Sequence, residues 1–234
     1  MKTVIIIPTY NEKENIEAII NAVFDQKIAD LSILIVDDDS PDGTAQIVKS
    51  LQTHFSNLHL IKRAGKLGLG TAYIAGFKYG LENNFETMIQ MDADFSHPVS
   101  KLPEMIELSN NYDLVIGSRY VKGGDVQNWP LIRKILSRGG SLYARVILGV
   151  KIKDFTAGFN AWNKKVLQKI DLDKIKSNGY SFQIEMKYKA KKLGFSHLET
   201  PIIFHDRTEG NSKMSKKIAI EAIWKTILIK LAKR

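Results

Sequence analysis

The chain has 234 residues, of which 44% are hydrophobic and 25% are charged, a balance typical of globular proteins with a sizeable core. It contains no cysteine, which excludes disulfides and metal sites built on thiolates. No uncharged stretch reaches the roughly 20 residues that cross a bilayer, and the apolar run near Met1 is too short for a signal peptide. We therefore expect a cytoplasmic protein, either soluble or attached to the face of a membrane.

The formal net charge of +9 is unevenly distributed along the chain. Residues 1–118 contain nine basic and sixteen acidic residues, whereas residues 119–153 contain eight basic residues and one acidic residue. Many individual lysines are expected simply to lie on solvent-exposed faces of the protein. An asymmetry this large nevertheless favours a polyanionic partner, such as nucleic acid, a phosphorylated substrate or an anionic membrane.

Short apolar runs alternate with amphipathic segments through the first half of the chain. The runs are continuously apolar, as in strands that are covered on both faces. Alternation of this kind predicts an α/β fold with a parallel sheet and right-handed crossovers. The expected strands are 4–7, 32–36, 58–62, 87–91 and 113–117, and the expected helices between them are 13–27, 44–55, 70–83 and 99–109.

The second half is less regular. Residues 205–215 are polar and contain glycine, which predicts a mobile loop. No repeat or linker divides the sequence, so we expect one domain over 1–215, followed by a basic, apolar helix at 216–234. The other expected elements are helices at 130–148 and 178–193, a strand at 197–204, and a loop at 154–159 that enters a strand.

Polar residues follow four of the predicted strands directly. In an open α/β sheet, ligands bind beyond the carboxyl ends of the strands, so these residues are expected to meet at one edge. The glycine-rich segment 65–70 matches neither common phosphate-loop pattern and is interpreted as a flexible connection. The four polar segments are Pro8–Glu12, Asp37–Asp39, Asp92–Asp94 and Gly117–Tyr120.

Asp92 and Asp94 stand one residue apart directly after an apolar run. Two crowded carboxylates are costly unless a positive charge lies between them, and Mg²⁺ commonly binds one or two carboxylates together with phosphate oxygens. The pair therefore suggests a divalent-cation site that holds a diphosphate. A simpler interpretation is that Asp94 or Ser96 caps the following helix. His97 and His205 lack the spacing of metal ligands and are interpreted as structural.

Seven stretches occur in the order and spacing of a known enzyme family. They read "VIIIPTYNEKENI", "ILIVDDDSPDGT", "MIQMDADFSHP", "LVIGSRY", "NWPLIRKILSRGGSLYARVILG", "DFTAGFNAW" and "HDRTEGNSKMS". Along nearly its full length the chain resembles the family-2 GT-A glycosyltransferases, and within them the dolichol-phosphate (polyprenol-phosphate) mannose synthases. The resemblance implies a GT-A fold, which is a Rossmann-like, mostly parallel sheet flanked by helices. It also implies that the protein transfers a sugar from a nucleotide donor.

The resemblance assigns a donor site for the nucleotide-sugar, with Mg²⁺ or Mn²⁺ as the cofactor. Asp94 would ligate the metal, and Ser96, where some family members carry glutamine, would complete the metal shell directly or through water. Arg207 and Lys213 would close over the diphosphate. The other donor-site residues implied by the resemblance are Pro8, Tyr10, Glu12, Val36, Asp38, Asp92, Ala93 and Arg119.

The acceptor implied by the resemblance is a polyprenyl monophosphate in a membrane. Arg119, Arg133 and Ser137 would bind its phosphate, and the last two lie four residues apart on one helix face. A phosphate monoester is already largely ionised at neutral pH, so it needs cations that orient it and no general base. The predicted reaction is inverting transfer of mannose from GDP-mannose, which gives a β-linked product.

A lipid acceptor requires contact with a membrane. The apolar, lysine-containing segment 216–231 is expected to lie in the interface, with Trp224 at its boundary, and the helix at 130–148 is a second candidate. The rival interpretation is a C-terminal helix that packs on the sheet. Some family members carry transmembrane helices or use a membrane partner subunit, whereas this chain matches the soluble form with the catalytic domain only.

Two alternatives stay open from the sequence. An enzyme with the same fold could use UDP-glucose with a lipid phosphate, or a glycan hydroxyl as acceptor, for which Asp154 is the nearest candidate base. The other alternative is a non-enzymatic module that binds nucleic acid or membranes through its basic surface. The intact metal and nucleotide motifs argue against this module, so no nucleic-acid partner is expected.

Overall fold

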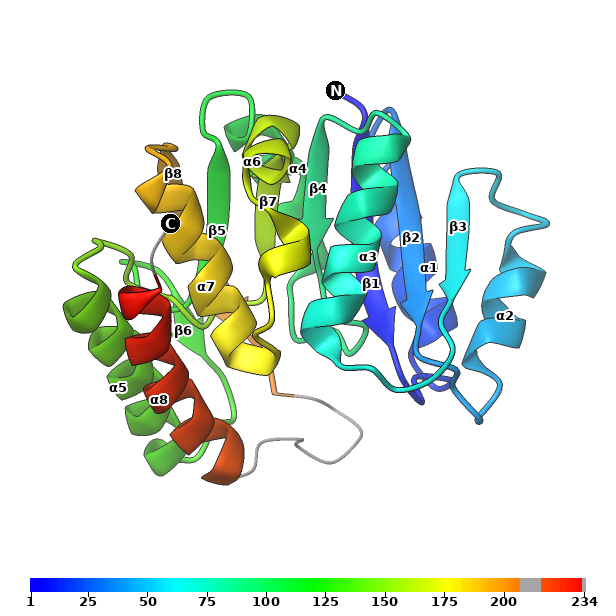
Figure 1. Cartoon of the computed structure of the whole chain (residues 1–234). Coiled ribbons are helices and arrows are strands. Elements are labelled where there is room, and N and C mark those ends of the chain that lie inside the picture. Colours follow the sequence, from blue (N-terminus) through cyan, green and yellow to red (C-terminus); the bar gives the residue numbers. More distant parts are fainter. Residues whose placement is uncertain (207–215, 233–234) are drawn as a thin grey trace.

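A seven-stranded sheet forms the centre of the protein (Figure 1). The computed structural model describes residues 1–206 and 216–232, with the side chains of the second range from Trp224 onward. The strands are β1 (Thr3–Thr9), β2 (Leu31–Asp37), β3 (Leu58–Lys62), β4 (Thr87–Gln90), β5 (Leu114–Ser118), β7 (Asn160–Asn163) and β8 (His197–Pro201). Their order in the sheet is β3-β2-β1-β4-β7-β5-β8. β7 pairs antiparallel with both of its neighbours, and all other pairs are parallel.

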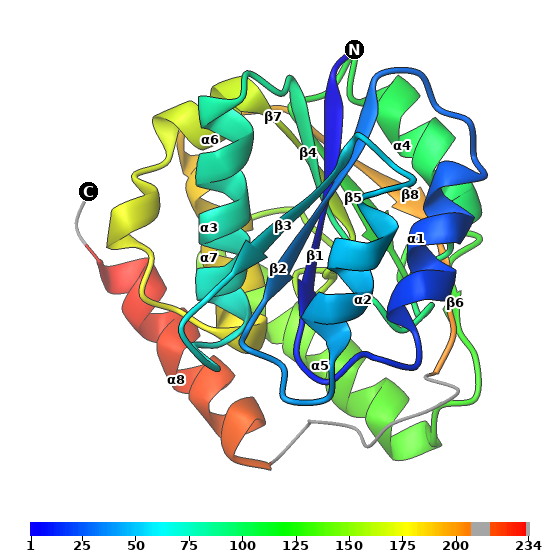
Figure 2. The ribbon, with the colours of Figure 1, turned by 90° about the vertical axis from the view of Figure 1, so that its right-hand side faces the viewer.

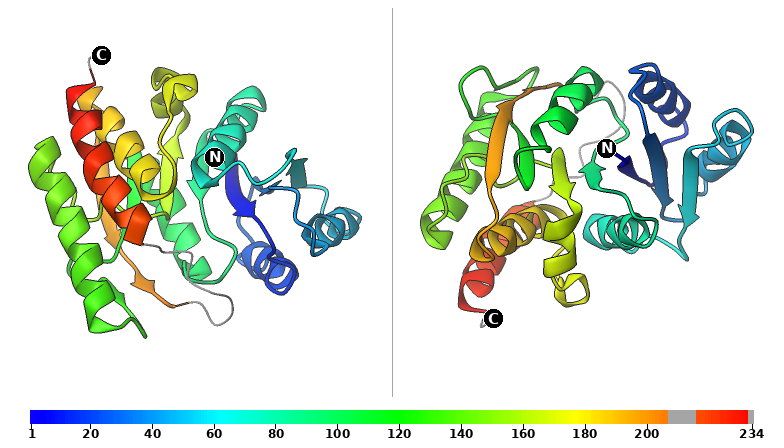
Figure 3. Two further views of the ribbon diagram at one scale, coloured as in Figure 1. Left: turned by 60° about the horizontal axis from the view of Figure 1, so that its bottom comes forward. Right: turned by 90° about the horizontal axis from the view of Figure 1, so that it is seen from above.

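Helices cover both faces of the sheet (Figure 2). One face carries α1 (Ile16–Phe24), α2 (Thr44–Leu51) and α4 (Leu102–Leu108), and the other carries α3 (Leu69–Glu82), α6 (Lys164–Lys169) and α7 (Gly179–Lys192). α5 (Leu131–Leu148) and α8 (Lys216–Leu231) lie side by side beyond α7 (Figure 3). Two short strands, β6 (Asp125–Val126) and β9 (Ile203–Phe204), pair separately. Within the described part of the chain, no helix is long and apolar enough to cross a membrane.

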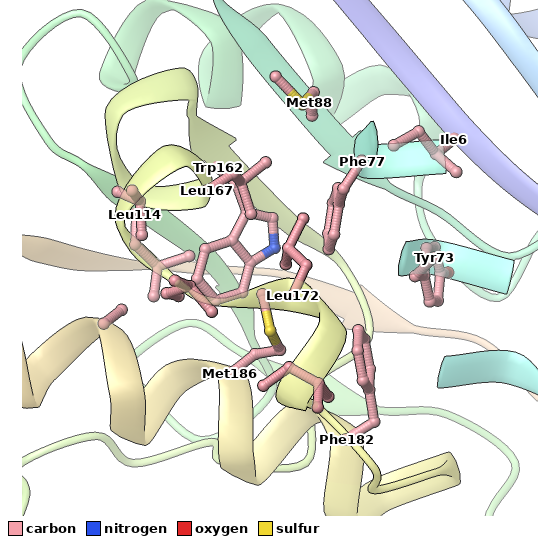
Figure 4. Packing of buried hydrophobic residues seen from close by; sticks show 14 of the residues in the cluster. Ile6, Tyr73, Phe77, Met88, Leu114, Trp162, Leu167, Leu172, Phe182 and Met186 are labelled. Atoms are coloured by element: carbon pink, nitrogen blue, oxygen red, sulfur yellow. The ribbon is translucent and has the colours of Figure 1, made fainter. Parts of the chain in front are cut away.

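The core consists of two hydrophobic layers, one on each face of the sheet. Along β1, Val4 and Ile6 belong to one layer and Ile5 and Ile7 to the other, because successive side chains of a strand point to opposite faces. Trp162 is fully buried in the first layer, beside Phe77 and other large side chains (Figure 4). Burial on both faces explains why the strands are continuously apolar in sequence.

The predicted α/β architecture is confirmed, and several element boundaries differ from the prediction. The first helix begins only at Ile16, and the helix expected at 99–109 opens with a 3-10 turn at Val99–Lys101. The strand expected at 197–204 is divided at Pro201, because the Ile202 N–H binds the Ser118 carbonyl while its own carbonyl accepts from the Asp125 N–H. The chain thus changes its pairing partner, from β5 along β8 to β6 along β9. The short elements β6 and α6, and a 3-10 turn at Leu172–Lys174, were not predicted.

Two helical glycines allow a matched test of the packing between α3 and β1. A Cβ atom at Gly76 would lie 2.4 Å from Ile6 Cγ2, whereas a Cβ atom at Gly139 in α5 would meet nothing within 4 Å. We expect Gly76→Ala to lower the free energy of unfolding by about 1–3 kcal/mol through overpacking. Gly139→Ala should raise it by about 0.5–1 kcal/mol through helix propensity. Urea unfolding measures both, and equal effects would contradict the close packing at Gly76.

Candidate functional site

A cleft of about 470 Å³ is lined by residues at and beyond the carboxyl ends of the parallel strands. These strand ends lie along the lower edge of the sheet in Figure 1. β7 runs in the opposite direction, so it begins at the edge where its neighbours end. The loop that precedes β7, residues 154–159, therefore reaches the same edge, and its Thr156 and Gly158 line the cleft. Segments that are far apart in sequence thus contribute side chains to one site.

The turn after β4 forms an acidic end of the cleft, in which Asp92 is held by two neighbours. Tyr73 donates a 3.4 Å hydrogen bond to Asp92 Oδ1, and His97 Nδ1 accepts a 3.0 Å hydrogen bond from the Asp92 N–H. Burial, together with the nearby carboxylates, raises the pKa of Tyr73 well above its ordinary value, so its hydroxyl stays a donor. His97 is buried and stacks on Phe159 at 5.0 Å. Its role is to order this turn.

Asp94 and Ser96 meet the requirements of the predicted metal site. Both residues line the cleft, and the Ser96 N–H donates to Asp94 Oδ1 at 3.1 Å. The Ser96 Oγ atom is buried and has no hydrogen-bond partner among the described residues, as expected for an oxygen that serves a ligand. Phe95 between them has a φ of 58°, and a large residue keeps this conformation only where its surroundings enforce it. In the described chain no three His, Cys, Asp or Glu side chains group as a metal cluster.

The three aspartates at the end of β2, Asp37–Asp39, have different roles. Asp37 is fully buried and accepts hydrogen bonds from the Ser40 N–H at 2.9 Å and the Ser40 hydroxyl at 2.6 Å, which ends the strand in a tight turn. Asp39 forms an exposed ion pair with Lys62. Asp38 lines the cleft. Of the three, Asp38 is therefore the candidate for contact with a nucleotide.

Asp38 also fixes the glycine-rich segment that was interpreted as a flexible connection. Its carboxylate pairs with Arg63 at 2.6 Å and accepts hydrogen bonds from the N–H groups of Leu67 and Gly68 at 3.2 and 3.3 Å. Lys66 in the same segment lines the cleft, and its ammonium lies 4.0 Å from the centre of the Tyr10 ring. The segment is thus a wall of the cleft and adds a cation to it.

At the opposite end of the cleft, Arg119 is 4% exposed and forms a bidentate ion pair with the fully buried Asp154. Nε donates to Asp154 Oδ2 at 2.7 Å, and Nη2 donates to Asp154 Oδ1 at 2.6 Å and to Thr156 Oγ1 at 2.7 Å. Burial alone would raise the pKa of Asp154, but the charge of Arg119 and its hydrogen bonds lower it. These hydrogen bonds to described residues use Nε and Nη2 and do not involve the two N–H groups of Nη1.

Arg133 on α5 lies at the same end of the cleft as Arg119. Its Nη1 donates to both carboxylate oxygens of Asp206 at 2.9 and 3.0 Å, and its guanidinium lies 4.0 Å from the centre of the Trp129 ring. The Arg119 guanidinium lies 5.6 Å from the same ring. One indole therefore lies beside both arginines, and the structure brings the two predicted phosphate ligands together.

Lys187 on α7 supports this end of the cleft from below. It is fully buried, and its ammonium donates to the carbonyls of Phe155 and Ala157 at 3.1 and 2.7 Å. Desolvation lowers its pKa from 10.5 to about 7, against the opposing influence of Asp154. Lys187 thereby holds the loop that carries Asp154 and Thr156.

Most of the predicted site residues line the cleft. Two do not: the Val36 side chain lies in the hydrophobic core below it, and Ser137 accepts a 2.6 Å hydrogen bond from the Tyr120 hydroxyl beside it. Arg207 and Lys213 lie outside the described residues. Asp154, the candidate base for a hydroxyl acceptor, is enclosed in its ion pair and cannot face a sugar. The predicted residues that do line the cleft are Pro8, Tyr10, Glu12, Asp38, Asp92, Ala93, Asp94, Ser96, Arg119 and Arg133.

Several residues that line or support the cleft were not predicted. Trp129 belongs to a quoted motif and Phe204 directly precedes another, but nothing in their pattern separated a site aromatic from a core aromatic. Lys187 stands among other lysines of a helix, where a solvated side chain is the usual expectation. The remaining unpredicted lining residues that bear on the site are Lys66, Thr156, Asn178, Tyr180, Gln183 and Asp206.

Comparison with known proteins defines the class of this site. Residues 4–171 match the family model described as Glycosyl transferase family 2. The chain belongs to glycosyltransferase family 2, and it is an enzyme of that class, as the sequence motifs predicted.

Two curated relatives are similar over most of their length. The Undecaprenyl-phosphate mannosyltransferase of Micrococcus luteus is 44% identical over 223 residues, which cover 95% of this chain and 91% of that protein. The Polyprenol monophosphomannose synthase of Mycolicibacterium smegmatis is 44% identical over 226 residues, which cover 96% of this chain and 85% of that protein.

Solved structures share the fold at much lower identity. A mannosyltransferase from Pyrobaculum calidifontis, in complex with GDP-Man and Mn²⁺, has a TM-score of 0.63 at 14% identity and covers 98% of this chain and 73% of its own. Glucosyl-3-phosphoglycerate synthase from Mycobacterium tuberculosis, in complex with Mn²⁺, UDP and its product, has a TM-score of 0.72 at 14% identity, over 100% and 81% of the two chains. The expected GT-A fold is thereby confirmed.

Lys187→Met tests the support beneath the basic end. The carbonyls of Phe155 and Ala157 would each lose one donor, although Ala157 would keep the Asn160 amide, so we expect the free energy of unfolding to fall by about 2–4 kcal/mol. The pKa of Lys187 is about 7 in the folded state and 10.5 in an ordinary lysine, so between pH 7 and pH 10.5 the unfolded chain binds one proton more than the folded chain. The advantage of the wild type over Lys187→Met should therefore widen as pH rises from 7 to 9.

Urea unfolding at pH 7 and pH 9 measures both effects. The matched control is Lys189→Met, since Lys189 is partly exposed and only pairs with Glu185 at 3.3 Å. Its effect should stay within about 0.5 kcal/mol. If the Lys187 variant loses no more stability than this control, the carbonyl contacts do not hold the loop.

Proposed function

We propose that the protein transfers mannose from GDP-mannose to the phosphate of a polyprenyl monophosphate, with inversion at the sugar and with Mg²⁺ or Mn²⁺ as cofactor. The observation that carries the proposal is one cleft with a carboxylate pair at one end and two arginines at the other. Two relatives at 44% identity bear names that combine mannose transfer with undecaprenyl phosphate or polyprenol. A structural neighbour binds GDP-Man and Mn²⁺.

The donor would occupy the acidic side of the cleft. Tyr10, Glu12 and Asp38 line the part proposed for the nucleotide, and Asp94 with Ser96 would hold the metal. When bound, the metal would neutralise charge that develops on the leaving diphosphate. Arg207 and Lys213 remain part of this proposal, as cations that close over the same diphosphate.

The acceptor phosphate would bind at the arginines. Among the described residues, Asp154 and Thr156 occupy three donors of Arg119 and leave the two on Nη1, while Asp206 occupies Nη1 of Arg133 and leaves its Nε and Nη2 edge. Such an edge fits two phosphate oxygens. Because the phosphate is already anionic, these residues need only hold it in line with the sugar. The burial of Asp154 in its ion pair removes the candidate base that a hydroxyl acceptor would have needed.

We propose that the protein works at the cytoplasmic face of a membrane, where a lipid acceptor would lie. α5 exposes a row of large apolar side chains on its outer surface, and Trp224, Leu228 and Leu231 of the adjacent α8 are also exposed. We propose that this surface enters the lipid interface, while Arg133 on the same helix faces the cleft. Its members on α5 are Leu131, Ile132, Ile135, Leu136, Leu142 and Val146, each between 52% and 73% exposed.

The reaction is tested with radiolabelled GDP-mannose and UDP-glucose, each with a short-chain isoprenyl monophosphate and Mg²⁺ or Mn²⁺. We expect labelled lipid from GDP-mannose, lost on addition of EDTA. Asp94→Asn should lower kcat/KM by about a hundredfold or more, because the charge that holds the metal is removed. Arg133→Met should raise the acceptor KM by about tenfold or more and leave the donor KM unchanged.

The outcomes separate the alternatives. Labelled lipid from UDP-glucose alone would correct the donor and keep the reaction class. No labelled lipid from any nucleotide-sugar, with a folded protein, would refute lipid-phosphate transfer.

Membrane attachment is tested with vesicles that contain anionic lipid. The double variant Ile132→Glu and Leu136→Glu should bind vesicles about tenfold more weakly or worse, because two apolar side chains that enter the lipid become charged. Its activity on a short-chain, water-soluble acceptor should stay near that of the wild type. The matched control is Leu193→Glu, at an exposed leucine after α7. A wild-type protein that does not bind vesicles would refute direct attachment and point to a membrane partner subunit.

A further inference from the structure

Trp129 is a buried cleft residue that the proposed reaction does not yet use. It is 8% exposed, lines the cleft, and its Nε1–H has no hydrogen-bond partner among the described residues. An indole N–H is a donor only and usually finds a partner when buried. An unpaired indole donor inside a binding cleft is therefore available to an oxygen of a ligand.

The indole also lies beside both acceptor arginines. The Arg133 guanidinium is 4.0 Å from its ring centre, within the range of a cation–π contact, and the Arg119 guanidinium is 5.6 Å away. The ring centres of Trp129 and Phe204 lie 5.4 Å apart with their planes at 73°, and the Phe204 ring centre lies 5.6 Å from the Arg119 guanidinium. These rings restrict the positions that the two guanidinium groups can adopt.

The aromatic contacts offset the electrostatic repulsion between the two arginines. Two like charges repel each other, and among the described residues each arginine pairs with one carboxylate, Asp154 for Arg119 and Asp206 for Arg133. The electron-rich face of an indole attracts a cation without neutralising it. Trp129 can thus keep both arginines near each other and still leave them able to bind a dianion.

We propose that Trp129 positions Arg119 and Arg133 for the acceptor phosphate and donates its own Nε1–H to a phosphate oxygen. The inference rests on the proposed function, because it assumes that this end of the cleft binds a phosphate monoester. It goes further by assigning Trp129 as a third phosphate-binding group and as the residue that sets the spacing of Arg119 and Arg133.

Two substitutions separate the two roles of Trp129. Trp129→Phe keeps an aromatic face and removes the N–H, so the acceptor KM should rise about three- to tenfold, as for loss of one hydrogen bond. Trp129→Leu removes the face as well, and the acceptor KM should rise further, by about thirtyfold or more in total. The donor KM should change less than twofold in both variants, since the nucleotide lies at the other end of the cleft.

A binding measurement keeps the test independent of catalysis. Titration of the full-length protein with a short-chain isoprenyl monophosphate, without donor, should change the tryptophan fluorescence. The change should persist in Trp224→Phe, which removes an exposed indole on α8, and should be absent in Trp129→Phe.

The outcomes are distinct. Acceptor KM values at the wild-type level in both Trp129 variants, or equal rises in donor and acceptor KM, would overturn the inference and leave Trp129 a structural residue. A wild-type protein that binds no isoprenyl phosphate and forms no labelled lipid would instead refute the proposed function itself.

Discussion

The buried ion pair between Arg119 and Asp154 is the interaction on which the architecture of the site depends. It joins the end of β5 to the loop before β7, which are 35 residues apart in the sequence. Removal of either partner would leave an uncompensated buried charge, at a cost of about 3–5 kcal/mol. Lys187 holds the same loop through two carbonyl groups. The loop can therefore not move without exposing a buried charge, which keeps Thr156 and Arg119 in place.

This rigidity gives the cleft two ends of opposite charge at a fixed separation. The carboxylates after β4 suit a cation, and the arginines at the other end suit an anion. A transfer between two phosphate-bearing substrates needs such an arrangement, because each substrate is held by its own counter-charges while the sugar lies between them. A chain of ring contacts links the two ends of the cleft. Trp129 contacts Phe204, Phe204 contacts His97, and His97 accepts a hydrogen bond from the Asp92 N–H.

α5 connects the site to its proposed surroundings. One side of this helix supplies Arg133 to the cleft, while Ile132 and Leu136 on another side are exposed to the outside. A lipid acceptor would contact both sides of α5. Its chain would lie in the membrane against the exposed side, and its phosphate would reach Arg133 on the cleft side. The contact between α5 and α8 broadens the apolar surface with Trp224 and Leu228.

The sequence by itself determined the strand and helix alternation, the acidic turn at Asp92 and Asp94, and the gathering of polar residues at one edge. These features depend on periodicity and turn chemistry, which are local. Only the tertiary structure decided that β7 runs antiparallel between β4 and β5, because strand pairing is a long-range choice. It also decided that Val36 faces the core and that Asp154 is enclosed in an ion pair with Arg119. Lys187 is fully buried, although it belongs to a helix with several lysines, where a solvated side chain is the usual expectation. Burial and the choice of partner depend on which elements meet, and no local pattern in the chain specifies that.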